Sequence, residues 1–336
     1  MRRRVSYAAL TLCCLLLCCG CDKNDIAVQI PDGSAVQDAD LSMPYIGMIL
    51  KSVDNPFFSV IKSSAEKAAD DIGAQLIVVA PSKETKSSEQ EELIRTMSQM
   101  AIDVMIADPC SDFDLTDALD EAEENGKYIL SVDTPLDFPD ACYIGTDHYT
   151  AAHELGSYAA QLIEPTQKAV ILRGAEQDAT HDLREQGLSQ ALMDAGILSF
   201  TTYSCDGSEE EAESYVKELL EQEEPPALIC AASDAIALGA ADAAYDTGSD
   251  VHIVSFDGLA QVTECIMDGT IDAAMAQDPE KIGKACVETA VKVFQGDEVP
   301  EHVYIPAKLI TAENAEQHAK QLSQYAGRTS RSDTSK

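Results

Sequence analysis

The sequence predicts an α/β protein of two Rossmann-like lobes, each a parallel sheet flanked by helices. Short apolar runs alternate with amphipathic helical segments through most of the 336 residues. Most of these runs are continuously apolar rather than alternating with polar residues, which is typical of parallel strands buried on both faces. About nine strand–helix units exceed one doubly wound sheet, so two open sheets fit the length better than an α/β barrel, the main competing architecture.

The elements of the body follow one another in a regular order. The first helix has an apolar face with spacings of three and four residues from Phe57 to Ile72, and Gly73 is expected to end it. Asn55 is its expected N-cap and Pro56 its first residue. Strands are expected at Tyr45–Leu50, Gln75–Ala80, Val104–Ala107, Tyr128–Val132, Ala169–Leu172, Phe200–Tyr203, Ala227–Cys230, His252–Phe256 and Ile271–Met275.

Both ends of the chain differ from this body. Residues 1–20 carry three arginines and then an apolar run, which predicts a signal peptide. The Gly20-Cys21 pair resembles a bacterial lipobox, although Cys18 and Cys19 replace its usual Leu and small residue, so Cys21 is the expected lipidation site. An ordinary secretory signal with incidental cysteines is the alternative. Residues 21–43 are an expected flexible tether after the lipidated cysteine, and residues 323–336 an expected disordered tail.

Composition excludes several classes of partner. The chain has 59 Asp and Glu against 23 Lys and Arg, a formal net charge of −36, and loss of the signal peptide would remove three arginines more. Such a surface repels phosphate backbones, so no nucleic-acid partner is expected. The six cysteines after residue 21 form no C-x-x-C pair, and the histidines form no H-E-x-x-H, so neither a metal nor a cofactor is expected.

The first candidate site follows the first strand, because open α/β sheets bind ligands beyond the carboxyl ends of their strands. Phe57 belongs to the apolar stripe of the helix. Phe58 lies one residue off that stripe and is expected to be exposed to a cleft or to solvent, where its ring could stack on the apolar face of a sugar. Packing of Phe58 against a neighbouring loop is the alternative.

Polar residues follow other strands in the same way. Each has a simple structural explanation, with Asp234 as a helix cap, Asp257 as a turn former and Arg184 as a surface charge. Together they predict a polyol ligand, because carboxylates accept hydrogen bonds from hydroxyls and an Arg fork donates to two adjacent oxygens. The residues concerned are Asp133, Thr134, Arg184, Ser233, Asp234, Asp257 and Gln277.

Six segments, in order and spacing, resemble periplasmic sugar-binding proteins of the ribose-binding type over about residues 44–312. They are Val-Asp-Asn-Pro-Phe-Phe (53–58), Ser-Val-Asp (131–133), Leu-Arg-Glu-Gln-Gly (183–187), Ser-Asp-Ala-Ile-Ala-Leu-Gly-Ala (233–240), Val-Ser-Phe-Asp-Gly (254–258) and Ala-Gln-Asp-Pro (276–279). The resemblance implies a type I periplasmic-binding-protein fold with a three-stranded hinge. Its lobes would be residues 44–147 plus 277–305 and residues 148–276 plus 306–322.

The resemblance also assigns roles to the candidate residues. In the first lobe, Asn55, Phe57 and Phe58 would line the pocket wall beside Asp133. In the second lobe, Arg184, the Ser233-Asp234 turn and Asp257 would face them, with Gln277 at the hinge. Thr134 and Ser233 stand where ribose binders usually carry Arg and often carry Asn, so another pentose, a hexose or a cyclitol stays open as the ligand.

The resulting expectation is a monomeric, exported binding protein, anchored through Cys21 to the outer face of the cytoplasmic membrane. It would capture a small polar ligand, a monosaccharide first of all, between closing lobes and deliver it to an ABC permease. The alternative is a sensory protein that reports its ligand to a histidine kinase or chemoreceptor. An enzyme is not expected, because the sequence has no G-x-S-x-G or Walker-type motif. A sugar-responsive repressor is excluded because no basic helix-turn-helix precedes residue 44.

Overall fold

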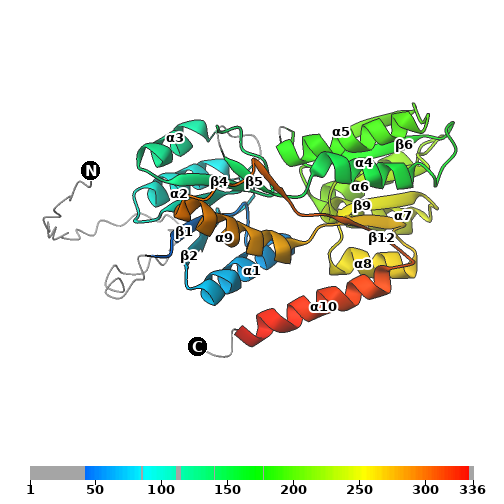
Figure 1. The fold of residues 1–336 in the computed structure, drawn as a ribbon. Coiled ribbons are helices and arrows are strands. Elements are labelled where there is room, and N and C mark those ends of the chain that lie inside the picture. The colour runs from blue at the N-terminus through cyan, green and yellow to red at the C-terminus, as the bar shows by residue number, and fades with distance from the viewer. Residues whose placement is uncertain (1–41, 85, 111–114, 140, 177, 333–336) are drawn as a thin grey trace, which may run out of the picture. The chain divides into compact units, whose positions relative to one another are not determined.

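Two six-stranded sheets organise the chain. The computed structural model describes residues 42–332, apart from residues 85, 111–114, 140 and 177 (Figure 1). The first sheet has the strand order β11-β5-β4-β3-β1-β2 and the second the order β12-β10-β9-β8-β6-β7. Their strands are β1 (Tyr45–Ile49), β2 (Gln75–Val79), β3 (Val104–Ala107), β4 (Tyr128–Val132), β5 (Cys142–Gly145), β6 (Ala169–Arg173), β7 (Phe200–Ser204), β8 (Leu228–Ala231), β9 (His252–Asp257), β10 (Ala273–Ala276), β11 (His302–Tyr304) and β12 (Lys308–Thr311).

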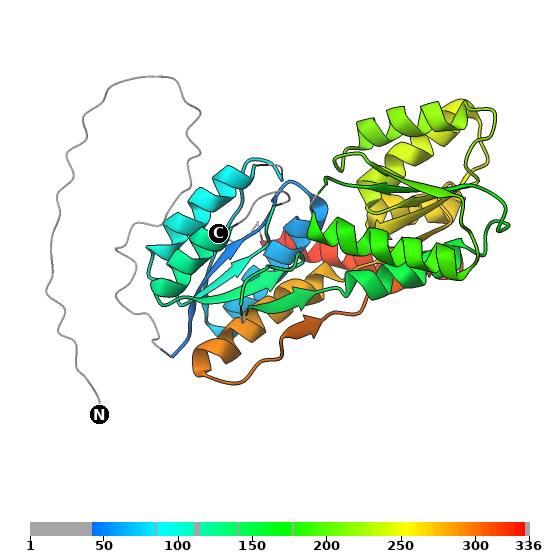
Figure 2. The same ribbon diagram turned by 90° about the horizontal axis from the view of Figure 1, so that it is seen from above.

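Helices cover both faces of each sheet. Figure 2 shows α2 and α3 on one face of the first sheet, with α1 and α9 on the other. In the second sheet, α4 and α5 cover one face and α6, α7 and α8 the other. The helices are α1 (Pro56–Ile72), α2 (Ser87–Ser98), α3 (Thr116–Glu124), α4 (His148–Ala159), α5 (Ala179–Asp194), α6 (Glu209–Leu220), α7 (Asp234–Thr247), α8 (Ala260–Asp268), α9 (Pro279–Gln295) and α10 (Ala315–Ser332).

Burial on both faces explains the unbroken apolar strands. In β1, Ile46 and Met48 pack into the cluster beneath α1 and α9, whereas Ile49 packs on the opposite face beneath α2 and α3. In β6, Val170 and Ile171 divide between the two faces of the second sheet in the same way. Successive side chains of a strand alternate between faces, so every position must be apolar when both faces are covered. The predicted fold class, two α/β lobes with parallel sheets, is confirmed.

The chain passes between the sheets three times. It enters the second sheet after β5, returns to the first-sheet side through α9 after β10, and leaves β11 for β12. The first lobe is defined here by β1–β5, β11, α1–α3 and α9, and the second by β6–β10, β12, α4–α8 and α10. All the strands pair in parallel except β12, which is antiparallel to β10. The three strands β5, β11 and β12 were not among those expected from the sequence.

The first helix begins and ends where its sequence predicts. The side chain of Asn55 accepts a hydrogen bond from the amide of Phe57 at 3.0 Å, Pro56 is the first helical residue, and Gly73 ends the helix with φ 79°. One member of the predicted apolar stripe is misplaced, because Ile72 in the last turn is 39% exposed.

Glycines allow the helix pairs of the second lobe to pack closely. A Cβ on Gly187 of α5 would lie 2.4 Å from the carbonyl oxygen of Tyr149 in α4. A Cβ on Gly239 of α7 would lie 2.1 Å from the carbonyl oxygen of Glu209 in α6. Both separations are far inside van der Waals contact, so these glycines, which end or nearly end two of the six sequence segments, are explained by helix packing.

The structure describes the C-terminal segment as far as Ser332 but not the first 41 residues. The expected signal peptide, Cys21 and most of the tether fall within residues 1–41, outside the described part. The tail expected to be disordered from residue 323 is instead helical as far as Ser332, where α10 ends. Apolar residues at Leu322, Tyr325 and Ala326 continue the helical spacing there. Within the described residues, no helix is both long and apolar enough to cross a membrane.

Candidate ligand site

A pocket of about 680 Å³ lies where the carboxyl ends of strands from both sheets meet. In the first lobe, the pocket is lined by residues that follow β1 and β4 and by the first turn of α1. In the second lobe, it is lined by residues at or after the ends of β6, β7, β8 and β9. The structure therefore brings together nine of the ten residues singled out from the sequence. These are Asn55, Phe57, Phe58, Asp133, Arg184, Ser233, Asp234, Asp257 and Gln277.

The β1–α1 junction forms the apolar wall of the pocket. Phe57 and Phe58 are each 4% exposed, and their rings meet edge to face with centroids 5.2 Å apart. Phe58 lines the pocket, as expected of a ring that points towards a cleft, but it is buried rather than exposed because both rings also belong to the core of the first lobe. The amide of Asn55 is already engaged, since its Nδ2 donates to Glu84 Oε1 at 3.0 Å while its Oδ1 caps α1.

Asp133 follows β4 in a left-handed conformation, with φ 59°. Its carbonyl oxygen accepts hydrogen bonds from Tyr143 Oη and His148 Nε2, both at 2.8 Å, and these bonds hold the strained backbone. Asp133 is 3% exposed, and its Oδ1 has no hydrogen-bond partner among the described residues. Burial raises the pKa of Asp133 to about 6, against the opposing effect of Lys51 and Arg184.

Thr134 is the one predicted residue that does not line the pocket. Its hydroxyl lies 2.8 Å from the hydroxyl of Thr180 at the start of α5. The contact joins the two lobes beside the pocket, and both hydroxyls are buried. The position next to Asp133 thus faces the other lobe rather than the pocket interior.

Arg184 is a buried charge and not the surface residue of the simplest explanation. Its Nη1 donates to the carbonyl oxygen of Ala232 at 2.7 Å and lies 3.2 Å from Asp257 Oδ1, and its guanidinium stacks 4.1 Å from the centre of the Phe256 ring. Its Nε donates to His148 Nδ1 at 3.4 Å. Because Nδ1 accepts, the proton of the neutral imidazole sits on Nε2, which therefore donates to Asp133. Burial, and then the charge of Arg184, lower the pKa of His148.

Asp234 and its neighbours anchor the turn between β9 and α8. Ser233 stands at the N-cap position of α7, although its side chain makes no capping bond among the described residues. Asp234 is the first helical residue, so it is not the helix cap of its simplest explanation. Instead its carboxylate accepts from Ser255 Oγ at 2.6 Å and from the amides of Gly258 and Leu259 at 3.2 and 2.6 Å. Burial and the nearby Asp257 raise the pKa of Asp234 to about 8.

Asp257 and Gln277 are joined at the ends of β9 and β10. Gln277 Nε2 donates to Asp257 Oδ1 at 2.8 Å, and the amide of Gln277 donates to the carbonyl oxygen of Asp257 at 3.0 Å. The bond from Nε2 fixes the orientation of the Gln277 side-chain amide, because a carboxylate can only accept hydrogen bonds. Gln277 Oε1 is left buried and without a partner among the described residues. Asp257 has φ 113°, so its backbone is strained like that of Asp133. In both residues the strained conformation places a side chain at the pocket.

The sequence did not reveal the ion pair that joins the lobes. Lys51 follows β1, and its Nζ lies 3.2 Å from Oδ2 of Asp178, which caps α5 through bonds from Thr180 and His181. Both side chains are under a tenth exposed. Burial would lower the pKa of Lys51, but the surrounding carboxylates raise it instead. The indication available was position alone, since both residues stand at a strand-to-helix junction.

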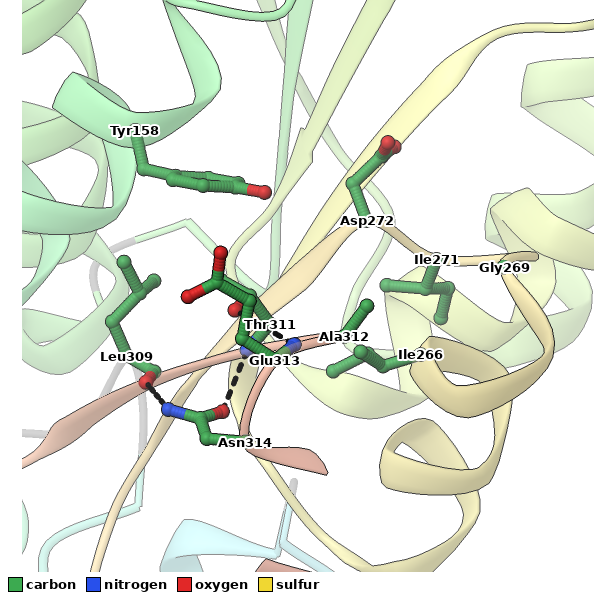
Figure 3. Close-up of a pocket in the computed structure, with 10 residues that line it drawn as sticks. All are labelled: Tyr158, Ile266, Gly269, Ile271, Asp272, Leu309, Thr311, Ala312, Glu313 and Asn314. Carbon is green, nitrogen blue, oxygen red and sulfur yellow. Dashed lines mark hydrogen bonds between the residues drawn. The ribbon is translucent and has the colours of Figure 1, made fainter. Parts of the chain in front are cut away.

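A second hollow of about 560 Å³ lies wholly within the second lobe, around β10 and β12 (Figure 3). Its polar groups are largely satisfied by the protein. Asn314 donates to the carbonyl oxygen of Leu309 at 3.0 Å and accepts from the amide of Thr311 at 2.9 Å, while Asp272 accepts from the amide of Ile253. The pocket between the lobes differs because it retains buried, unpartnered acceptors. Among the described residues, no group of three His, Cys, Asp or Glu is placed to hold a metal ion.

Comparison with known proteins gives a consistent picture. Over 267 residues the chain is 25% identical to the ribose import binding protein RbsB of Bacillus subtilis, covering 79% of this chain and 87% of that protein. A solute-binding protein from Actinobacillus succinogenes with bound D-allose superposes with a TM-score of 0.76 at 23% identity, covering 82% of this chain and 99% of that one. The Caulobacter myo-inositol binding protein gives a TM-score of 0.77 at 20% identity, covering 88% and 99%.

The structural neighbours share the fold, and the resemblance to ribose-binding-type proteins that the sequence motifs indicated is confirmed. The relatives are substrate-binding proteins, which agrees with the expectation that this chain is not an enzyme. Residues 46–298 match the periplasmic binding protein domain. The chain therefore belongs to the periplasmic binding protein domain family.

Proposed function

We propose that this chain binds a small polyhydroxylated ligand, a monosaccharide or a cyclitol, between its two lobes and delivers it to an ABC-type importer. The observation that carries the proposal is a pair of buried acceptors without partners, Asp133 Oδ1 and Gln277 Oε1, in one pocket. Buried polar atoms are rarely left without hydrogen bonds, so the unmet need points to donors on a ligand. Hydroxyl groups are such donors.

The rest of the pocket suits the same class of ligand. The rings of Phe57 and Phe58 offer an apolar wall against the carbon face of a sugar ring or cyclitol. Burial lowers the pKa of His181 to about 3, so the imidazole is neutral, and its Nδ1 accepts from the amide of Gly174 at 3.1 Å. Its Nε2 therefore carries the proton and is a hydrogen-bond donor for a ligand oxygen.

Contacts from both lobes would couple binding to closure. A ligand stabilises the closed form only through its greater affinity for that form, and here Asp133 contributes an acceptor from the first lobe and Gln277 one from the crossing between the lobes. Thr134 is better assigned to the contact between lobes than to the ligand, because its hydroxyl meets Thr180. The names of relatives support the class of ligand, since the Bacillus subtilis protein is a ribose import binding protein.

Membership of a periplasmic binding protein family places the function outside the cytoplasm. We extend this to anchoring at the outer face of the cytoplasmic membrane through a lipid on Cys21. Metabolic labelling with a fatty acid tests the anchor. Wild-type protein should incorporate label and fractionate with membranes, whereas Cys21→Ala should do neither; unlabelled wild-type protein would contradict the anchor.

A thermal-shift screen of sugars, cyclitols and amino acids, followed by calorimetry, tests the ligand class. A tight ligand raises the melting temperature because it binds only the folded state. Small-angle scattering with that ligand should show a smaller radius of gyration, and deletion of the gene should abolish its uptake by cells. Selective stabilisation by amino acids, with no response to any polyol, would contradict the proposed function.

A further inference from the structure

The charges that surround the pocket are unequal. Two cationic side chains line it, Lys51 and Arg184, and both are already paired. Lys51 is bonded to Asp178, and Arg184 Nη1 contacts Asp257 and the carbonyl oxygen of Ala232. Each cation therefore already has a direct partner, and its charge is shared when it also acts on Asp133.

Carboxylates remain after this pairing. Besides the two paired aspartates and Asp234, the described lining includes Asp133, Glu84, Asp206 and Glu209. None of these four forms an ion pair with a Lys or Arg among the described residues. Glu84 accepts a bond from the neutral amide of Asn55. The pocket thus presents an excess of negative charge to whatever enters it.

The excess is sharpest near Lys51. Four carboxylates act on this single ammonium group, those of Asp178, Asp108, Asp133 and Glu84. Asp178 takes the direct bond, and Asp108 Oδ2 accepts from the backbone amide of Lys51 at 3.1 Å. Asp133 and Glu84 both line the pocket, and the first has a buried oxygen to which no group of the described residues donates.

A neutral sugar would give that oxygen a charge-assisted hydrogen bond but would bring no positive charge into the pocket. An ammonium group would supply the hydrogen bond and an opposite charge together. Desolvation strengthens the preference, since the attraction between opposite charges grows as water is excluded. The apolar wall at Phe57 and Phe58 is compatible with either ligand.

We propose that the preferred ligand is an amine-bearing polyol, an amino sugar or aminocyclitol, whose ammonium group binds the free carboxylate oxygen of Asp133 in the pocket that Glu84 also lines. The inference rests on the proposed function and narrows the class of ligand at the same site. It differs from what the names of the relatives would indicate, since ribose, allose and myo-inositol carry no amine.

Calorimetric titration with matched pairs tests the proposal. D-glucosamine and D-galactosamine are compared with D-glucose and D-galactose, and an aminocyclitol with myo-inositol, at pH 7.5. At least one amine should bind about tenfold or more tightly than its hydroxyl partner. N-acetylglucosamine, which has a neutral amide, should lose the advantage.

Substitution and pH then locate the charge. Asp133→Asn keeps the size of the side chain and tolerates the left-handed backbone, and it should abolish the preference for the amine. Asp194→Asn, an exposed carboxylate on α5, is the matched control and should keep the preference. Burial raises the pKa of Asp133 to about 6, so the preference should fall as the pH is lowered through 6 and the carboxylate is protonated.

The outcomes separate the two proposals. Equal or tighter binding of the neutral sugars overturns the amine while leaving the sugar-binding function in place. A preference for the amine that survives in Asp133→Asn contradicts the assigned position. Binding of neither class overturns the amine and contradicts the proposed function as well.

Discussion

The two walls of the pocket are built in different ways. On the second-lobe wall, Arg184, Asp234 and Asp257 are held by hydrogen bonds and ion pairs within the protein, so their positions are set before any ligand arrives. On the first-lobe wall, two phenylalanine rings stand beside the unpartnered carboxylate of Asp133. The second lobe therefore acts as a preorganised template, whereas the first lobe retains the open hydrogen-bonding capacity.

The difference between the two walls predicts which substitutions change ligand affinity without lowering the stability of the protein. A substitution in the preorganised wall breaks contacts within the protein and should affect both folding and binding. A substitution at Asp133 removes a carboxylate whose Oδ1 has no hydrogen-bond partner among the described residues, so it should weaken binding without destabilising the protein. Each prediction below tests one side of this contrast.

The largest effect is expected for Arg184→Ala. The change leaves Asp257 buried without its cation, which should lower the free energy of unfolding by about 3–5 kcal/mol and abolish detectable ligand binding. Urea denaturation measures the first effect and calorimetry the second. Arg95→Ala removes a partly exposed arginine paired with Glu91 and Glu121 and should lower the free energy of unfolding far less, because solvent screens these pairs. If Arg184→Ala lowers the free energy of unfolding no more than Arg95→Ala does, the second-lobe wall is not preorganised by the Arg184 contacts.

The next effect belongs to Asp133→Asn and has the opposite sign for stability. The folded-state pKa of about 6 lies above the ordinary value for Asp, so the ionisation of Asp133 opposes folding increasingly between about pH 4 and 6. The variant should therefore exceed the wild type in unfolding free energy by about 2 kcal/mol at pH 7 and by little at pH 4.

Calorimetry should show ligand binding about 10–100-fold weaker in the same variant, because a hydrogen bond to a charged group contributes about 1.5–3 kcal/mol. Denaturation series at pH 4, 5, 6 and 7 give the stability difference. If the variant is less stable than the wild type at pH 7, the first-lobe wall is no more open than the second.

A smaller effect is expected where the walls meet. Asp178→Asn keeps the hydrogen bonds that cap α5 but removes the charge that faces Lys51. Lys51 retains Asp108 as a second partner, so we expect ligand binding about tenfold weaker and a larger radius of gyration without ligand. Scattering and calorimetry test both. An unchanged radius would show that the ion pair does not hold the lobes together.

The smallest effect is expected for Thr180→Val, which removes the hydroxyl that meets Thr134 across the lobes. A neutral hydrogen bond contributes about 1 kcal/mol, so the affinity should fall about fivefold. Thr150→Val on α4 is a matched control, since its exposed hydroxyl bonds Asp147 within the same lobe. Equal changes in affinity for Thr180→Val and Thr150→Val would contradict a contribution of the Thr134–Thr180 contact to ligand binding.

Much of the fold could be predicted from the sequence because its strongest features are local. Most of the nine expected strands are continuously apolar, and all nine appear within two residues of their expected positions. The strands β11 and β12 are short and carry exposed side chains, and β5 has only four residues, so none offers a long apolar run. Their places are set by pairing with strands far away in the sequence.

The site was predictable to the extent that strand ends gather in a parallel sheet. Position after a strand identified Asp133, Asp257 and Gln277 without knowledge of their contacts. Helical periodicity did not show that Phe58 is buried, because it describes one helix and not the core residues that Phe58 also contacts. The pairing of Lys51 with Asp178 spans 127 positions and joins two lobes, so no local pattern could show it.

The most direct test of the account is a crystal structure with the tightest ligand from the screen. The account predicts a ligand in the pocket between the lobes, with donors about 3 Å from both Asp133 Oδ1 and Gln277 Oε1 and with its carbon face against Phe57 and Phe58. A ligand bound elsewhere, or one that leaves both oxygens without a partner, would contradict it.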